Sequence, residues 1–424
     1  MNLSNENRLL LTCLQTKNSE VSLNQIKNLL RLPLNWNAVL ESAFRHGVAP
    51  LLYMNIRRVN GDPIVGQDVM NRLKKTYLLT AALNMRLYAE LRRILEAFHH
   101  EGIEVIVLKG AALAESVYGN IGLRSMGDID LLVKKENLSR ADKIMVHLGY
   151  IASPSHRSLE WYHKNHHHLP PYYQSENGVK VEVHWHIVKP SKPYHAKMIE
   201  RFWKRARPIK LANTQALVLS PEDLLLHLCL HSLSHGFAPK LLLRQLCDIS
   251  ESIKYYENEW DWVRFQEEVN EYQLTRLIHS TFYLIKEVLG NRVTDHVLSQ
   301  KGRRSVDLRL VELITRQIFV TDGDSSIYHT LLIRLLTANS FRDKAKIIGG
   351  TVFPSLETMS GWHDVPLSSK KIYLYYLMRP YILLSKYWSL IFIAFQLRHL
   401  GKMDFDVMSK DKNSQVFIGT KELK

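Results

Sequence analysis

Apolar residues recur at helical spacing, about 3.6 residues apart, through the first hundred positions. Short helices are predicted at 9–14, 26–32, 36–46 and 50–56. A longer run, 68–99, carries leucines from Leu73 to Leu95 on one broad stripe and is expected to end at Gly102. Nothing in this region points to chemistry, so it is interpreted as a helical packing layer.

The pattern changes between 103 and 190, where short apolar runs alternate with helical ones. Strands are predicted at 104–108 and 128–133, and helices at 110–118 and 136–148. Residues 172–174, a Glu-Asn-Gly turn at 176–178 and strict alternation over 179–188 predict a β-hairpin. Strands separated by helices indicate an α/β or α+β module.

From about 220 the chain returns to helical spacing. Ser220 is a capping residue, Pro221 suits the first helical position, and Asp223 lies three residues after the cap. Further helices are predicted at 239–253, 260–269, 272–289, 305–320 and 325–337. The glycine pair and the proline within 341–355 indicate a connection.

The segment 372–400 is rich in apolar and aromatic residues but contains Arg379, Pro380 and Lys386. Its longest uncharged run, 387–397, is shorter than the roughly 20 residues that a membrane span needs. No transmembrane span is therefore predicted. A buried helix pair or an amphipathic surface helix fits better, and peripheral membrane contact through 372–400 stays open.

Composition adds little to this picture, except for charge. The 424 residues are enough for two or three subdomains, and 46% apolar with 23% charged residues is ordinary for a soluble globular protein. The net charge of +15 favours a polyanionic partner, such as nucleotide phosphates, nucleic acid or an anionic membrane, although solubility alone also explains it. The three cysteines show no paired spacing, and the first residues do not resemble a signal peptide, so a cytoplasmic location is expected.

Candidate chemistry gathers on two predicted strands. Asp128 and Asp130 point the same way at the start of a strand, and two adjacent carboxylates call for a cation, best a hard divalent one. Glu182 and His184 share one face of the alternating strand. If this strand lies beside the first, three carboxylates converge and could hold Mg²⁺ for attack by a hydroxyl on phosphorus. The alternative is two loop-capping aspartates and a solvent-facing glutamate.

Other residues fit binding roles less specifically. Lys109 and Gly110 open a helix directly after a strand, where backbone amides attract phosphate, and Arg124 could pair with phosphate oxygens. His184 could support Glu182 or act as a base. On the predicted helix 239–253, Arg244 and Asp248 lie four residues apart and are most simply an ion pair, with a place lining the cleft as the alternative.

Two groups of histidines invite a metal interpretation. Three consecutive histidines at 166–168 are expected not to face one site together, and a solvated loop and a substrate-side role are equally favoured. His227, His231 and His235 share one helix face, yet no glutamate follows His227 in a zinc-protease pattern. Because their neighbours are apolar, core histidines or supports of a neighbouring site are favoured over zinc ligands.

The residues also match a family pattern: Lys-Gly, a tyrosine, an arginine, Asp-x-Asp on a strand, then an acid-x-His-Trp strand. In this chain the pattern falls on 109–130 and 182–185. The chain thereby resembles the uncharacterised nucleotidyltransferase family of bacteria, part of the DNA polymerase β-like nucleotidyltransferase superfamily. The resemblance is strong from about 75 to 250 and extends towards 400. It departs from the superfamily where Ala111 replaces the serine expected after Gly110, and in a longer gap before Asp128.

The resemblance implies an α+β fold, with a small mixed β-sheet nucleotidyltransferase core embedded in a mostly helical chain. The expected regions are 1–100, N-terminal helices; 101–215, the α/β core; 216–345, a helical domain; and 346–424, apolar and basic helices with a polar tail. It also implies that Asp128, Asp130 and Glu182 are catalytic and bind Mg²⁺ or Mn²⁺.

The predicted activity is Mg²⁺-dependent transfer of a nucleoside monophosphate from a nucleoside triphosphate to the hydroxyl of an unknown small-molecule, protein or RNA acceptor. Lys109, Gly110, Arg124 and His184 are expected to bind the substrate. Two alternatives stay open. One is a non-catalytic accessory protein that binds a nucleotide or a sugar phosphate in a biosynthetic pathway. The other is a toxin-like nucleotidyltransferase that modifies RNA.

Overall fold

The computed structural model describes residues 3–59, 64–153, 161–163, 166–188, 195–234, 241–290, 306–319, 331, 335–336, 338, 341–363, 365–366 and 368–384. They fall into two compact units. The first comprises the described residues up to Val306 and those of 314–319, and the second comprises 307–313 and the described residues from 331 onward. The candidate chemistry lies in the first unit.

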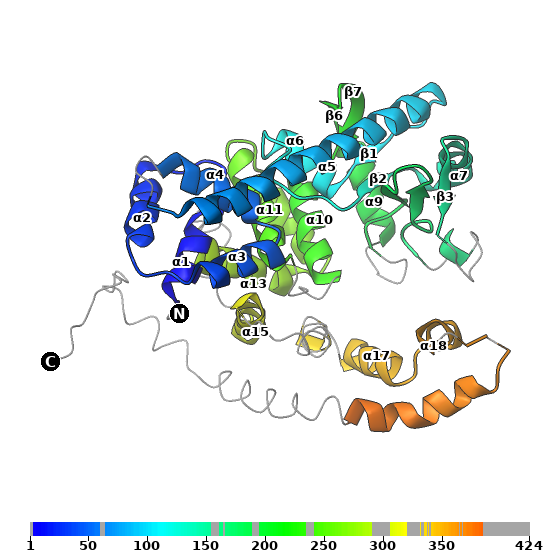
Figure 1. The fold of residues 1–424 in the computed structure, drawn as a ribbon. Helices are drawn as coiled ribbons and strands as arrows, with labels where there is room; N and C mark the ends of the chain where they lie inside the picture. The colour runs from blue at the N-terminus through cyan, green and yellow to red at the C-terminus, as the bar shows by residue number, and fades with distance from the viewer. Residues whose placement is uncertain are drawn as a thin grey trace. The chain divides into compact units, whose positions relative to one another are not determined.

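The N-terminal region is helical, as predicted (Figure 1). Its helices are α1 (Asn5–Thr12), α2 (Glu20–Leu30), α3 (Trp36–Arg45), α4 (Ala49–Val59) and α5 (Gln67–His100). Each of the first three begins at a side chain that accepts a backbone N–H, from Ser4, Ser19 and Asn35 respectively.

The leucine stripe expected on α5 is buried only in part. Leu78, Leu79 and Leu83 are exposed, whereas Thr80 and Asn84 are buried in this part of the helix. The Asn84 side chain donates hydrogen bonds to the backbone carbonyls of Ile121 and Arg124. The helix therefore uses a polar side chain here to hold the loop that precedes the first aspartate.

The strands form one mixed sheet in the order β3-β4-β5-β2-β1-β7-β6. They are β1 (Ile106–Val107), β2 (Ile129–Leu132), β3 (Tyr150–Ala152), β4 (Tyr172–Gln174), β5 (Lys180–His184), β6 (Arg207–Leu211) and β7 (Thr214–Val218). The pairs β2·β5 and β1·β7 are parallel, and the other neighbours are antiparallel. With the surrounding helices, this confirms the predicted α+β class.

One face of the sheet packs on α5 and on α7 (Leu138–His147). Val181 and Val183 enter this apolar core with Ile129 and Leu131. Because side chains alternate along a strand, the residues between them are directed to the opposite face. The core thus fixes which face of β2 and β5 carries the polar residues.

Two hairpins complete the sheet. The predicted hairpin is present as β4 and β5, although β5 ends at His184 rather than continuing to 188. The β6·β7 hairpin was not predicted. Its turn consists of Ala212 and Asn213, both with positive φ, as a two-residue hairpin turn requires.

The described chain after β7 is helical. Its helices in the first unit are α10 (Pro221–Ser234), α11 (Leu242–Tyr255), α12 (Trp262–Glu271), α13 (Thr275–Leu289) and part of α15 (Leu308–Phe319); α6 (Lys109–Ser116), the short η1 (Lys135–Asn137) and α9 (His195–Arg205) lie between strands. The predicted start of α10 is confirmed, because the Ser220 hydroxyl bonds to the Asp223 carboxylate and accepts the Asp223 backbone N–H.

The second unit contains α17 (Phe341–Val352), α18 (Leu356–His363) and a further helix over 371–384. The prediction of a connection at 341–355 was wrong, because Gly349 and Gly350 lie inside α17. In the helix 371–384, Leu377 and Tyr381 are each 77% exposed, so this part is not a buried helix pair. None of the described helices is long and apolar enough to cross a membrane. Residues 385–400 and most of 325–337 lie outside the described residues.

Candidate functional site

The parallel pairing of β2 and β5 brings the predicted carboxylates together. Asp130 lies directly opposite Glu182 in the register, and Leu132 lies opposite His184. Glu182 is therefore on the face that Asp130 occupies, as the sequence required for a shared site. Fifty-two positions separate these two residues in the chain, and the sheet places them on neighbouring strands.

Asp130, Glu182 and His184 form the tightest part of the cluster. One oxygen or nitrogen atom from each lies within 4.8 Å of the others. Asp128 precedes β2 and lies nearer the surface, with 35% of its side chain exposed against 6% for Asp130. The predicted triad is thus arranged as the buried Asp130, the partly buried Glu182 and the more exposed Asp128, with His184 beside them.

Two lysines neutralise these carboxylates. The Lys109 ammonium lies 2.9 Å from Asp130 Oδ1. The Lys180 ammonium lies 2.6 Å from Glu182 Oε1 and 3.2 Å from Asp128 Oδ2. Lys180 therefore joins Asp128 to the rest of the cluster. Its role could have been found in the sequence, because it lies two residues before Glu182 on the same face of an alternating strand.

His184 is a direct member of the cluster. Its Nε2 lies 2.8 Å from Asp130 Oδ1 and 3.5 Å from Glu182 Oε2. Burial lowers the pKa of this imidazole, but the hydrogen bonds to Asp130 and Glu182 outweigh burial and raise the pKa above its ordinary value. His184 is thus a hydrogen-bond donor to Asp130 and lies close to Glu182.

The three carboxylates differ in proton affinity. Burial raises the pKa of Asp130, but Lys109 and His184 outweigh it and hold that pKa well below the usual range. The pKa of Glu182 is also lowered, because hydrogen bonds from His184 and Lys180 outweigh its burial. The pKa of Asp128 is raised, first by burial and then by the charge of Asp130. Asp128 is therefore the carboxylate that takes up a proton most readily.

Contacts within the protein itself explain why Gly110 follows Lys109 at this turn. Lys109 has a φ of +45°, an unusual backbone conformation for a residue other than glycine. A Cβ atom on Gly110 would lie 2.2 Å from Arg124 Nη1. Glycine at 110 is thus required by the guanidinium packed over it, and this places Arg124 against the start of α6.

Arg124 is held in a buried ion pair with Asp248 of α11. Its Nη2 lies 2.7 Å from Asp248 Oδ2 and its Nε 3.1 Å from Oδ1, and the Tyr118 hydroxyl donates to the same carboxylate. The prediction that Arg244 pairs with Asp248 was wrong, because the Arg244 guanidinium donates instead to the backbone carbonyl and hydroxyl of Ser125. Both arginines therefore anchor the loop that leads to Asp128.

His227 on α10 lies close enough to the carboxylate cluster to interact electrostatically with it. It is buried, and its pKa is lowered, first by burial and then by the positive charges of Lys109 and His184. Within the described part of the chain, neither of its ring nitrogens has a hydrogen-bond partner. His231 follows one turn later, and its ring centre is 6.2 Å from that of His227. His235 lies outside the described residues.

The donor set suits a hard divalent cation. Carboxylate oxygens on neighbouring strands are the ligands that Mg²⁺ and Mn²⁺ prefer, and they lie close enough to share one ion. The ammonium groups of Lys109 and Lys180 already lie against these oxygens, so the site attracts positive charge. A cation bound here and an incoming phosphate would face the same polar side of the sheet.

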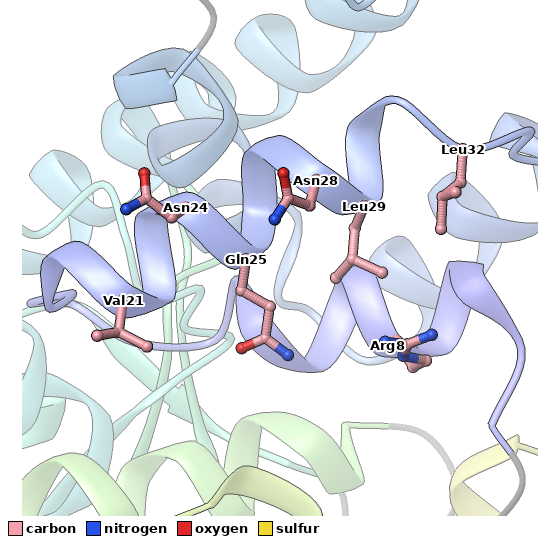
Figure 2. Close-up of a pocket in the computed structure, with 7 residues that line it drawn as sticks. All are labelled: Arg8, Val21, Asn24, Gln25, Asn28, Leu29 and Leu32. Atoms are coloured by element: carbon pink, nitrogen blue, oxygen red, sulfur yellow. The ribbon is translucent and has the colours of Figure 1, made fainter. Parts of the chain in front are cut away.

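A separate groove of about 550 Å³ lies between α1 and α2 (Figure 2). Seven residues line it: Arg8, Val21, Asn24, Gln25, Asn28, Leu29 and Leu32. None of these is an acid or a histidine, so the groove does not belong to the carboxylate cluster.

Comparison with known proteins agrees with this geometry. Residues 33–290, well over half of the chain, match a family described as an uncharacterised nucleotidyltransferase. No curated protein and no solved structure matches the chain. The family match covers the whole sheet, both lysines of the cluster and the helices that carry Asp248 and His227. The chain therefore belongs to the uncharacterised nucleotidyltransferase family.

Proposed function

We propose that the protein transfers a nucleoside monophosphate from a nucleoside triphosphate to an acceptor hydroxyl and releases pyrophosphate. One observation carries the proposal: Asp130 and Glu182 lie side by side on parallel strands, and Lys180 links Asp128 to them. Asp128, Asp130 and Glu182 would hold Mg²⁺ or Mn²⁺. When bound, the ion would neutralise phosphate charge and orient the reacting groups.

The proton transfer in this reaction is assigned to residues of the protein. The acceptor oxygen attacks the α-phosphorus, the bond to pyrophosphate breaks, and the hydroxyl proton passes to a carboxylate. The lowered pKa of Glu182 makes this carboxylate a weak base. Asp128, with its raised pKa and greater exposure, is better suited to accept the proton, and Glu182 to serve as a ligand.

Lys109 is the residue best placed to bind the triphosphate. It begins α6, where backbone N–H groups point outward, and its ammonium already contacts the cluster. Arg124 is committed to Asp248 by two hydrogen bonds, so we assign it to positioning Gly110 and the Asp128 loop. His184 would keep Asp130 and Glu182 oriented.

A second candidate function is nucleotide binding without transfer. The lysines favour binding without transfer, because the ammonium groups of Lys109 and Lys180 neutralise the charge of the carboxylates in the absence of any added cation. An accessory protein would keep these ion pairs, whereas an enzyme must exchange Lys180 for a divalent ion during each turnover. The proposal includes a small molecule, a protein or RNA as the acceptor and a cytoplasmic setting at or near a membrane surface.

The test uses the full-length protein with Mg²⁺, cell extract and nucleoside triphosphates that carry label at either the α- or the γ-phosphate. Nucleotidyl transfer predicts an acceptor labelled from the α-position only. Asp130→Asn and Glu182→Gln should each abolish it. Glu104→Gln is the matched control, because Glu104 is an exposed carboxylate paired with Lys134.

Each outcome has a distinct meaning. Label from the γ-position would indicate phosphoryl transfer and contradict the proposal. Label that survives Asp130→Asn would remove the cluster from the reaction. No label from any nucleotide, combined with a nucleotide-dependent rise in melting temperature, would support binding without transfer.

A further inference from the structure

The three consecutive histidines at 166–168 come together, so the prediction that they cannot face one site was wrong. One ring nitrogen from each lies within 4.8 Å of the others. The ring centres of His166 are 4.6 Å from His167 and 4.1 Å from His168, and those of His167 and His168 are 4.9 Å apart. The chain pairs here through a single β-bridge at His168, so successive side chains do not alternate as in a strand.

The backbone that carries these rings is fixed to the end of β5. His168 forms its bridge with His184, and the Leu169 N–H donates to the Val183 carbonyl at 2.9 Å. The Trp185 N–H donates to the His167 carbonyl at 3.0 Å. Because these bonds set the positions of the Cα atoms, bringing the three nitrogens together requires only small rotations of the side chains.

Two of the three rings, those of His167 and His168, have a ring nitrogen suited to act as a ligand. His168 Nδ1 lies 2.6 Å from the Leu169 carbonyl oxygen, so this nitrogen carries the proton and Nε2 carries the lone pair. His167 Nδ1 is buried without a hydrogen-bond partner among the described residues. Burial and then the charge of His184 lower the pKa of both His167 and His168.

We propose that His166, His167 and His168 form a second metal site, which binds a transition-metal cation such as Zn²⁺ through three imidazole nitrogens. Tetrahedral Zn²⁺ with bonds of about 2.0–2.1 Å places its ligands about 3.4 Å apart. The three nitrogens lie within 4.8 Å of one another, so the rings would move closer together around the ion. Three protein ligands leave one position open for water or a substrate oxygen. Nitrogen donors select such metals over Mg²⁺, which distinguishes this site from the carboxylate cluster.

The two sites would be neighbours. The ring centre of His168 is 5.1 Å from that of His184, which contacts Asp130. The histidine site does not depend on the proposed nucleotidyl transfer, because none of its three ligands is a member of the carboxylate cluster. An oxygen bound at its open position would lie beside the polar face of β5.

The test titrates Co²⁺ into full-length protein that carries no histidine tag and has been stripped of metal. We expect one equivalent to bind with visible d–d absorption, to be displaced by Zn²⁺ and to resist excess Mg²⁺. His167→Gln with His168→Gln should weaken this binding at least hundredfold. The matched control is His99→Gln with His100→Gln, an exposed pair of adjacent histidines on α5 that should leave binding unchanged.

Two results would overturn the proposal: Co²⁺ binding that survives His167→Gln with His168→Gln, or an equal loss in the His99 and His100 control. A measurement on the wild-type protein guards against a variant that fails to fold. Pulsed EPR of bound Cu²⁺ counts coordinated imidazoles, and fewer than three would refute the site. Asp130→Asn with Glu182→Gln should retain Co²⁺ binding, which keeps this test separate from that of the carboxylate cluster.

Discussion

Lys180 limits how readily the carboxylates of the cluster can bind a divalent cation. Its ammonium contacts both Asp128 and Glu182, and burial of this ammonium is outweighed by these partners, so its pKa is raised. The lysine therefore stays charged at physiological pH and competes with any divalent cation for the same oxygens.

Replacing Lys180 with Met removes the competing charge and keeps most of the side-chain volume. We expect Mn²⁺ to bind more tightly, on the order of tenfold, which corresponds to about 1.4 kcal/mol. Isothermal titration calorimetry measures the change. Lys134→Met, which removes an ammonium from a surface ion pair with Glu104, should leave Mn²⁺ affinity unchanged. Weaker Mn²⁺ binding in the Lys180 variant would mean that the lysine supports the ion rather than competing with it.

His46 makes the stability of the first unit depend on pH. Its buried ring bonds to the Ile318 carbonyl, and burial, helped by the charge of Arg45, lowers its pKa to about 4. An unfolded histidine titrates near 6.5. The stabilisation is therefore complete above about pH 6.5 and is lost as the pH falls from there towards about 4, by up to about 3 kcal/mol.

His46→Gln keeps a donor for Ile318 and removes the titrating ring. Urea unfolding between about pH 7 and about pH 4.5 should show a shallower loss of stability in this variant than in the wild-type protein. Parallel pH profiles for the two proteins would rule out the assignment.

Single residues show where sequence reasoning succeeds and where it stops. Asp128, Asp130 and Glu182 were found because local alternation fixes which way each side chain points. The partner of Arg124 was not found, because Asp248 lies 124 positions away and only the packing of α11 brings it close. The same holds for Lys109, whose contact with Asp130 depends on the pairing of β1 with β2.

At the level of elements, the start of α6 depends on one glycine. A methyl group on Gly110 would meet the Arg124 guanidinium, which cannot withdraw without breaking its buried bonds to Asp248. We expect Gly110→Ala to reduce the free energy of unfolding by about 1–3 kcal/mol. Gly127→Ala is the control, because nothing lies within 4 Å of its added Cβ, and its effect should stay within about 0.5 kcal/mol. Equal unfolding midpoints for the two variants would contradict the close approach of Arg124.

Elements with strong local signals were predicted well. The β4·β5 hairpin has a Glu-Asn-Gly turn, and α10 has a serine cap followed by proline. The β6·β7 hairpin lacks such signals, because Pro208 and charged residues interrupt β6 and its turn is Ala-Asn. In α17 the glycine pair suggested a break, but a helix tolerates glycine at a cost of about 1 kcal/mol per residue, which other interactions can offset.

At the level of the whole molecule, the two compact units should unfold as two transitions in calorimetry. The carboxylate cluster belongs to the first unit, so Mn²⁺ should raise only that transition. At a hundredfold excess over the dissociation constant, the stabilisation is about 2.7 kcal/mol. The double variant Asp130→Asn with Glu182→Gln should lose the shift. A Mn²⁺ effect on both transitions, or one that persists in the double variant, would place the ion elsewhere.

The order of strands in the sheet has a consequence for the growing polypeptide. Ile106 of β1 pairs with Leu132 on one side and with Leu217 on the other. The ribosome must therefore release more than a hundred further residues before β1 has both neighbours, and Asp130 meets Glu182 only after β5 has emerged. A nascent chain that ends before β5 presents Asp128 and Asp130 without their partner strand, so the carboxylate cluster cannot assemble until that strand has been made.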